Sequence, residues 1–153
     1  MINNSPEYWM KIALKEAIKA LDRNEIPIGA IVVKDNSIIG RGFNQKELLN
    51  DPTAHAEIIA LTSAANTLNG WRLNDSQIYV TKEPCPMCAG AIMNARISKI
   101  YFGMYDKEAG CCGSLYQICR DPRFNHQSTV NGGVLELECR QLMKDFFYEK
   151  RNS

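Results

Sequence analysis

Two short motifs constrain this chain more than any other feature: residues 55–57 (HAE) and residues 84–88 (PCPMC). They provide an imidazole, two thiols and a carboxylate, which are the residue types of a hydrolytic zinc site. A structural zinc site is normally closed by four protein ligands, whereas a catalytic site keeps three and leaves the fourth position to water. His55, Cys85 and Cys88 supply three ligands. The chain is therefore expected to fold so that these side chains meet, and the pattern predicts a catalytic zinc site.

The spacing within each motif indicates how its side chains are presented. Cys85 and Cys88 are three residues apart, so in the first turn of a helix they share one face, where the positive end of the helix favours thiolates. His55 and Glu57 open a second predicted helix, and two helix N-termini are expected to converge on one ion. Because only one residue separates Glu57 from His55, we expect Glu57 to act as a proton shuttle and not as a ligand.

The length of the chain and its apolar content predict one globular domain over residues 1–153. A chain of 153 residues buries roughly two thirds of its unfolded surface in a single core, so no metal is needed merely to hold it together. The apolar fraction of 45% and the charged fraction of 23% are ordinary for a globular protein. No apolar run reaches membrane-spanning length, and residues 1–11 lack the features of a signal peptide. We expect a cytoplasmic protein with no membrane partner.

The remaining cysteines and the net charge are less informative. Cysteines 111, 112, 119 and 139 lack the spacing of metal ligands and are expected to be small, buried, apolar side chains. The net charge of +1 gives no sign of nucleic-acid binding, which ordinarily shows as a basic face or a high pI. Composition alone does not indicate an RNA substrate.

Periodicity and turn residues predict alternating strands and helices. The predicted elements are a helix capped by Ser5 and ending near Asn24, strands over 29–34 and 37–43 joined by a tight turn, a helix from 55 to about 68, a strand over 77–81, a helix over 85–95, a strand over 99–103, a short helix near 114–119 and a helix over 137–150. Residues 44–54 and 121–131 are predicted to be polar loops. This order implies a parallel arrangement with right-handed crossovers, to which the opening hairpin adds one antiparallel strand.

Longer segments of the chain resemble a known family. The segments EYWMKIAL, IPIGAIVVKDNSIIGRGFN, DPTAHAEIIAL and EPCPMCAGAIMNARISKIYFG are similar to bacterial tRNA-specific adenosine deaminases of the cytidine deaminase superfamily. The zinc motif is shared by that wider superfamily and does not select the substrate. The C-terminal third, with GSLYQI, DPRFNH and GGVLELECRQLMKDFF, resembles the tRNA-acting branch more than the enzymes for free bases or nucleosides.

The resemblance implies a fold, a reaction and roles for individual residues. The fold is an α/β, three-layer α/β/α cytidine deaminase-like fold around a five-stranded mixed sheet. The protein is a homodimer that converts the wobble adenosine of a tRNA anticodon to inosine. His55, Cys85 and Cys88 hold one Zn²⁺ per subunit, and Glu57 is the catalytic proton shuttle. The substrate-binding positions are Asn44, which holds the purine beside the Ala56 backbone, and the anticodon-loop positions Asp106, Asn125, His126, Phe147 and Arg151.

Other interpretations of these positions stay open. Asn44 could simply end a strand, His126 could satisfy loop carbonyls, and Arg151 could be a frayed terminal charge. The chain also departs from the family at Lys82, where leucine is more common, and at the cysteines at 111 and 112. At the level of the whole protein, the alternatives are a deaminase of a small molecule such as guanine or cytosine, and a non-enzymatic, zinc-stabilised interaction domain.

Overall fold

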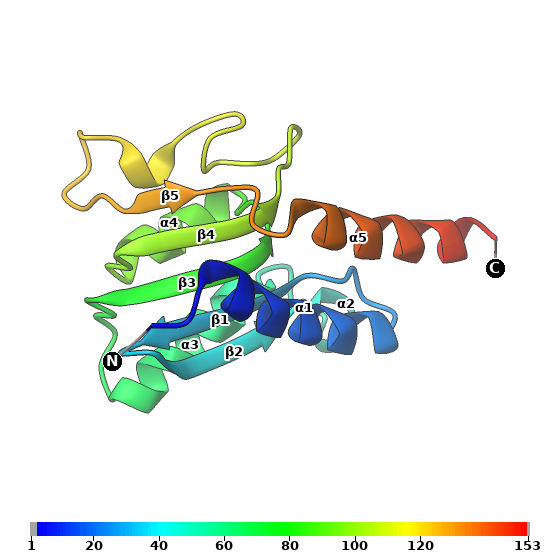
Figure 1. The fold of residues 1–153 in the computed structure, drawn as a ribbon, viewed down its shortest axis with the longest axis horizontal. Helices are drawn as coiled ribbons and strands as arrows, with labels where there is room; N and C mark the ends of the chain where they lie inside the picture. The colour runs from blue at the N-terminus through cyan, green and yellow to red at the C-terminus, as the bar shows by residue number, and fades with distance from the viewer. Residues whose placement is uncertain (1–2, 153) are drawn as a thin grey trace.

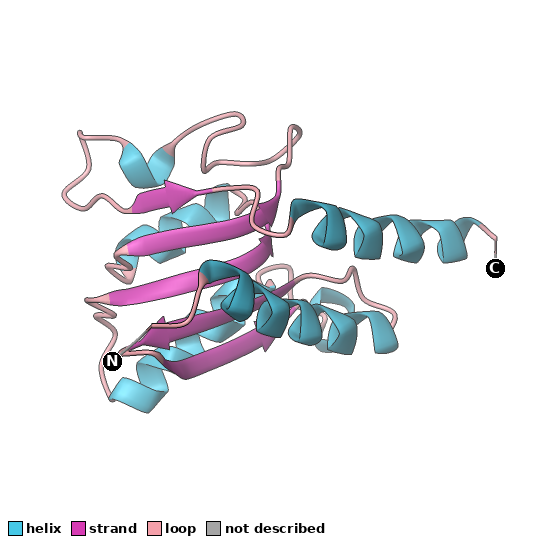
Figure 2. Cartoon of the chain, viewed as in Figure 1, coloured by secondary structure: helices cyan, strands magenta, loops and turns pink. Residues whose placement is uncertain are grey.

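The computed structural model describes residues 3–152, so the ends of the predicted domain, residues 1–2 and 153, lie outside the described residues. Five strands and six helical segments follow one another along the chain (Figures 1 and 2). They are α1 (Pro6–Asp22), β1 (Gly29–Lys34), β2 (Ser37–Phe43), α2 (Lys46–Leu49), α3 (Ala56–Leu68), β3 (Ser76–Lys82), α4 (Pro86–Asn94), β4 (Lys99–Met104), the 3₁₀ helix η1 (Ile118–Arg120), β5 (Thr129–Asn131) and α5 (Glu136–Arg151).

The strands form one mixed sheet in the order β2-β1-β3-β4-β5. Strand β1 is antiparallel to both of its neighbours, whereas β3, β4 and β5 are parallel to one another. Helices α1 and α5 cover one face of the sheet, and α3 and α4 cover the other (Figure 1). This is the predicted three-layer α/β/α fold, and β1 is the one antiparallel strand that the hairpin adds.

Local sequence signals account for the start of the fold. Helix α1 begins where predicted, because the Ser5 hydroxyl accepts a hydrogen bond from the Tyr8 backbone N–H at 3.2 Å. Asp35 and Asn36, with φ of 51° and 58°, form the left-handed turn between β1 and β2. Asp and Asn tolerate this conformation, and the resulting twist matches that of the hairpin strands.

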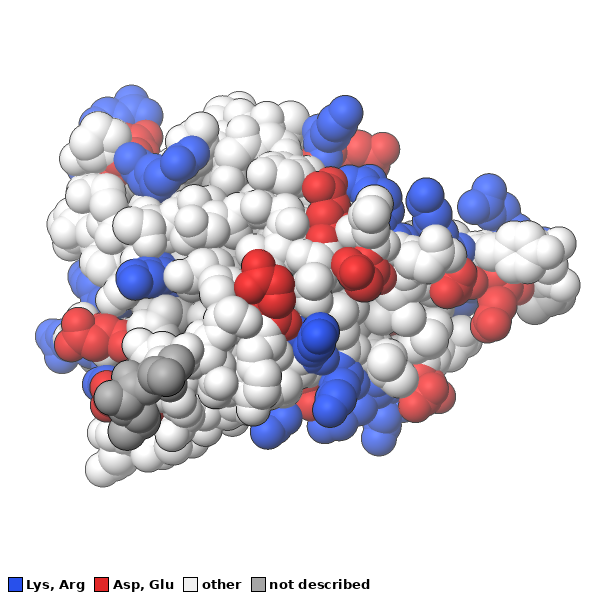
Figure 3. Space-filling view, in the orientation of Figure 1, with Lys and Arg blue, Asp and Glu red and all other residues white. Residues whose placement is uncertain are grey.

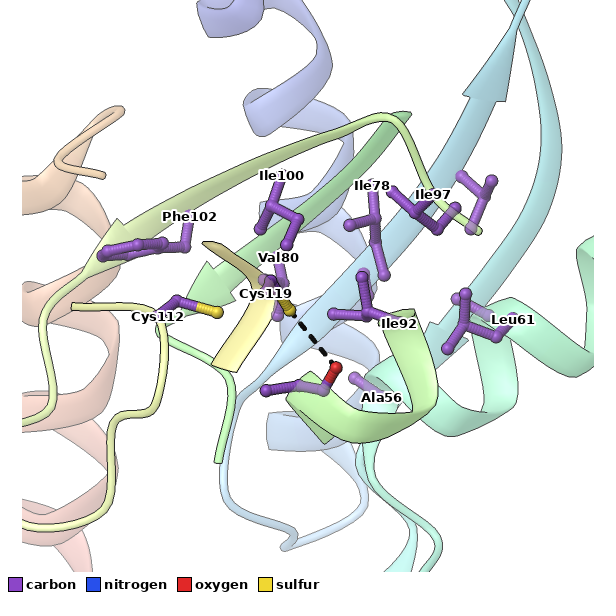
Figure 4. Close-up of a cluster of buried hydrophobic side chains, with 14 of the residues drawn as sticks. Ala56, Leu61, Ile78, Val80, Ile92, Ile97, Ile100, Phe102, Cys112 and Cys119 are labelled. Carbon is purple, nitrogen blue, oxygen red and sulfur yellow. Dashed lines mark hydrogen bonds between the residues drawn. The ribbon is translucent and has the colours of Figure 1, made fainter. Parts of the chain in front are cut away.

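Strand alternation divides the apolar side chains between two cores. Ile31 and Val33 of β1 face α1, whereas Val32 packs with Ile78 of β3 in the core beneath α3 and α4. Figure 4 shows this second core, where the Cys119 thiol donates a hydrogen bond to the Ala89 carbonyl of α4 at 3.2 Å. The prediction that cysteines 111, 112, 119 and 139 are buried is confirmed, because each is at most 3% exposed.

Three details differ from the sequence prediction. The short helix predicted near residues 114–119 lies instead at Ile118–Arg120, because Cys112 and Gln117 pair in a β-bridge before it. The loop predicted over 121–131 contains β5, a strand of three residues that pairs with β4. The loop predicted over 44–54 contains α2, whose first turn is held by the distant Glu25 carboxylate.

In the described part of the chain, no helix has the length and apolarity needed to cross a membrane.

Candidate metal centre

Three side chains from the two motifs meet at one point. The ligand atoms of His55, Cys85 and Cys88 all lie within 4.8 Å of one another. His55 Nδ1 is 3.7 Å from Cys85 Sγ and 3.4 Å from Cys88 Sγ. Tetrahedral donors at the usual zinc bond lengths of about 2.0 to 2.3 Å lie roughly 3.5 Å apart, so the spacing and the donor set fit such an ion. The group is placed to bind a metal.

The local fold explains how the ligands converge. His55 is the N-cap residue of α3, and Cys85 is the N-cap residue of α4. Cys88 lies in the first turn of α4. Pro86 is the first residue of this helix, where the lack of a backbone N–H in proline costs no helical hydrogen bond. The predicted convergence of two helix N-termini is therefore observed, and both helices direct their positive ends toward the thiols.

Neighbouring groups perturb the ionisation of the cluster. The Cys88 thiol and the His55 ring hydrogen-bond the Cys85 sulfur, and despite burial they lower the pKa of Cys85 to about 4. The hydrogen bond that the His55 ring donates to Cys85 in turn raises the pKa of His55. Burial raises the pKa of the Glu57 carboxyl. A thiolate at Cys85 is the form that binds a metal.

Glu57 lies beside the three ligands without belonging to their group. Its side chain is buried, 4% exposed, at the start of α3. Its carboxyl is within hydrogen-bonding reach of the Cys88 thiol. A buried carboxylate next to a metal-binding cluster is placed to exchange protons there.

Asn44 directly follows β2, and Ala56 is the first residue of α3. Ala56 is fully buried at the first position of α3. Asn44 is 4% exposed, donates to the Ile26 carbonyl at 3.3 Å and accepts from the Lys46 N–H at 3.4 Å. The next backbone N–H, that of Gln45, donates to the carbonyl preceding His55 at 3.0 Å. The structure thus ties the segment that follows Asn44 to the segment that carries His55.

Asp106 belongs to the loop that follows β4. Its carboxylate pairs with Lys82 at 3.2 Å and accepts hydrogen bonds from the backbone N–H groups of Glu108 and Ala109. Despite partial burial, the N–H donors and Lys82 lower the pKa of Asp106. The unexpected lysine at position 82 therefore neutralises a carboxylate beside the metal-ligand turn.

Within one chain, the other predicted RNA contacts lie toward opposite ends of strands β3 and β4. Asn125 is exposed and His126 half-buried, and His126 Nε2 is 2.8 Å from the Ile97 carbonyl, just before β4 begins. Cys85 follows the opposite end of the parallel strand β3. Phe147 and Arg151 are exposed on α5, which leaves the sheet at the end where β3 and β4 finish (Figure 1).

Three buried carboxylates were not predicted from the sequence: Glu16, which is 3% exposed, and Glu25 and Glu83, which are each 2% exposed. Glu25 accepts hydrogen bonds from the first N–H groups of α2. Glu83 accepts hydrogen bonds from the loop after β4. For Glu83, the signal in the sequence is its position directly before Pro84, where it and Lys82 follow the strand QIYVT.

The surface charge shows no single-sign face in the view of Figure 3. Basic and acidic side chains are intermixed over α1 and α5, in keeping with the net charge of +1. Any attraction for a polyanion on this face is therefore local and not a property of the whole surface.

Known deaminases are similar to this chain over nearly its whole length. Residues 4–151 match the model of the MafB19-like deaminase family. A tRNA-specific adenosine deaminase of Bacillus subtilis (strain 168) is 46% identical over 145 residues, which cover 95% of this chain and 90% of the relative.

Solved structures show the same relationship. A structure from work on A-to-I editing by tRNA A34 deaminases at the wobble position of transfer RNA superposes with a TM-score of 0.84 at 41% identity, covering 88% of this chain and 98% of that one. A guanine deaminase from Bacillus subtilis gives a TM-score of 0.64 at 38% identity and covers 67% of this chain and 66% of that one. The chain therefore belongs to the MafB19-like deaminases and, among them, to the family of tRNA-specific adenosine deaminases.

Proposed function

We propose that this protein deaminates adenosine to inosine, with release of ammonia, at the wobble position of a tRNA anticodon. The observation that carries the proposal is the cluster of three ligand atoms within 4.8 Å, with the buried Glu57 beside it, in a chain 46% identical to tRNA-specific adenosine deaminases. The structure at a TM-score of 0.84 supports the same substrate more fully than the guanine deaminase at 0.64.

The metal is zinc, and His55 Nδ1, Cys85 Sγ and Cys88 Sγ hold it. One imidazole and two thiolates match the borderline-soft character of this ion. Zinc, when bound, supplies Lewis acidity that lowers the pKa of water toward about 7. Three protein ligands are the number that would hold a catalytic zinc, whereas a structural site normally has four.

Glu57 moves the protons of the reaction. Its carboxylate takes one proton from the attacking water and delivers it to N1 of the adenine ring as the C6–O bond forms. It then transfers the second proton to the amine at C6, so that ammonia leaves and inosine remains. Its burial beside Cys88 supports this role, because a carboxylate shielded from bulk water exchanges protons only with groups in the site.

The base and the anticodon loop are held by different sets of residues. Asn44, next to the backbone of Ala56, orients the purine through its side-chain amide. This amide has two donor and two acceptor positions, and the bonds to Ile26 and Lys46 use one of each. The residues assigned to the flanking RNA are Asp106, Asn125, His126, Phe147 and Arg151. Single-stranded RNA is typically bound through stacking and local contacts, which explains how a chain of net charge +1 can bind it.

The active unit is a homodimer formed through α3. A groove of about 260 Å³ beside this helix is lined by Ile58, Ala65, Trp71 and neighbouring uncharged residues. The only charged residue of α3 is the buried Glu57, and depletion of charge is typical of the core of an interface. The proposed occupant of this groove is a second copy of the chain, because the family that the sequence resembles is dimeric.

The dimer is tested at Thr62, an exposed residue that lines grooves on both sides of α3. Thr62→Arg should convert the dimer to a monomer in sedimentation experiments without changing the core. Lys15→Arg, at an exposed position of α1, is the control and should sediment as the wild type. A wild-type monomer at micromolar concentration would contradict the dimer.

We further propose that residues 1–153 form a single deaminase domain that acts in the cytoplasm. One sheet with helices on both faces accounts for the described residues. The tRNA substrate named for the relatives supports the compartment.

One assay separates this function from the alternatives. The purified protein is incubated with an anticodon stem-loop that carries wobble adenosine and, separately, with guanine, cytosine and adenosine. Inosine in the RNA alone supports the proposal. Turnover of a free base would make the protein a small-molecule deaminase, and no turnover with tightly held zinc would make it a binding domain.

A further inference from the structure

Glu83 is a buried carboxylate between β3 and the first metal-ligating cysteine. It follows Lys82, the last residue of β3, and precedes Pro84 and Cys85. Its side chain is 2% exposed, and the described residues that contact its oxygens come from the loop after β4. An ionised carboxylate at such a position is stable only if hydrogen bonds replace its lost hydration.

Both oxygens of Glu83 accept hydrogen bonds from this loop. Oε1 accepts from the Asp106 N–H at 3.0 Å and from the Ser114 hydroxyl. Oε2 accepts from the N–H groups of Cys112 at 3.1 Å and Ser114 at 2.9 Å. One side chain therefore fixes the loop at its beginning, where Asp106 lies, and at its end.

Backbone contacts join the same two segments. The Glu83 N–H donates to the Met104 carbonyl at 2.9 Å, and the Cys111 N–H donates to the Pro84 carbonyl at 2.8 Å. Gly110 lies so close that a Cβ there would be 2.3 Å from Glu83 Cδ. The loop of residues 106–114 and the turn that presents Cys85 are thus packed as one unit.

We infer that Glu83 is a positioning residue for deamination, which holds the loop 106–114 against the turn carrying Cys85 and thereby fixes both the ligand and Asp106. This inference rests on the proposed function. The carboxylate of Glu83 matters because it offers about four acceptor sites and no donor. A glutamine has only one acceptor oxygen. Its NH₂ group would face backbone N–H groups, which are donors and cannot accept a hydrogen bond from it.

The test compares Glu83→Gln with the wild type after loading with zinc or with cobalt(II). We expect the variant to fold and to bind one metal per chain, but its kcat on the stem-loop should fall about 10- to 100-fold, as for groups that orient metal ligands. The cobalt absorption bands, which report ligand geometry, should shift. Ser114→Ala removes one of the four hydrogen bonds and should have a smaller effect in the same direction.

If Glu83→Gln does not fold, Gly110→Ala tests the positioning role of Glu83 instead, because this variant keeps the Glu83 carboxylate. Its methyl group should push the loop from Glu83, shift the cobalt bands and lower kcat. Gly90→Ala is the matched control, because a Cβ at Gly90 meets nothing within 4 Å. Wild-type cobalt bands and wild-type kcat in Glu83→Gln or Gly110→Ala would overturn the inference. Failure of the wild type to form inosine would instead overturn the proposed function, and the cobalt bands would still decide the role of Glu83.

Discussion

At the scale of single residues, the proposed function assigns metal binding and proton transfer to neighbouring residues of one motif. His55 ends the extended segment before α3, and Glu57 lies in the first turn of the helix. Only His55 belongs to the group of close ligand atoms with Cys85 and Cys88, whereas the Glu57 carboxyl lies beside that group, within reach of Cys88. This separation is what makes the two roles independently testable.

Glu57→Ala should lower kcat by about 10² to 10⁴-fold, because it removes the group that transfers protons. Zinc should remain bound, since the three ligands are unchanged. Steady-state kinetics and elemental analysis of the same preparation measure the two effects. Glu47→Ala, on the surface of α2, is the control and should change neither. Loss of zinc from Glu57→Ala would make Glu57 a ligand.

Cys88→Ala should remove the metal and the activity while the protein still folds. A tetrahedral zinc site loses most of its affinity when only two protein ligands remain. Cys119→Ala is the matched control, because Cys119 is also buried near α4 but lies outside the ligand group. The measurement is zinc per chain; equal zinc content in the two variants would argue against the assigned ligands.

At the scale of elements, the placement of α3 depends on glycines in β2. A Cβ at Gly42 would lie 2.4 Å from the Ala56 carbonyl and 2.7 Å from the Ala60 N–H. Helix α3 can therefore lie directly on the strand, and its N-terminus reaches the cysteines of α4. Substitutions in this contact should act on the site through the helix.

Gly42→Ala should lower the free energy of unfolding by about 1 to 3 kcal/mol, because the added methyl group overpacks the contact between strand and helix. Activity should fall with it, since α3 carries His55 and Glu57. Gly90→Ala, within α4 and facing open space, should instead raise stability by about 0.5 to 1 kcal/mol. Urea denaturation measures both, and equal shifts would refute the contact as the cause.

At the scale of the whole molecule, we expect the fold not to depend on a bound metal. Two apolar clusters, one on each face of the sheet, hold the described residues together without the ligand sulfur of Cys85. A chain of 153 residues has a sufficient core of its own. The metal is therefore expected to serve the reaction and not the fold.

Removing zinc with a chelator should abolish deamination and leave the far-ultraviolet circular dichroism unchanged. Activity should return when zinc is added back. A reversible loss of helical signal on chelation would instead indicate a structural metal.

RNA binding should be steeply sensitive to salt although the net charge is only +1. Contacts to phosphates release counterions, so log kcat/KM on the stem-loop should fall linearly with log salt concentration. Thermal unfolding over the same range controls for effects of salt on stability. A flat dependence would count against binding through the RNA backbone.

The sequence by itself determined the motifs, the elements and the ends of most helices and strands. These depend on local causes: the cap at Ser5, the turn at Asp35 and Asn36, and the alternation of apolar residues in β1. The family resemblance added the fifth strand. The residues of Thr129–Asn131 do not reveal it, because a strand of three residues, of which the first and last are polar and exposed, has too little pattern.

Only the tertiary structure decided what distant segments do for one another. Helix α2 is four residues long and depends on Glu25, and the loop after β4 depends on Glu83. Each carboxylate is stabilised by N–H groups more than twenty positions away in the chain. A short window of sequence does not record such pairs, because the cost of burying the charge and the hydrogen bonds that offset it arise only once the chain has folded.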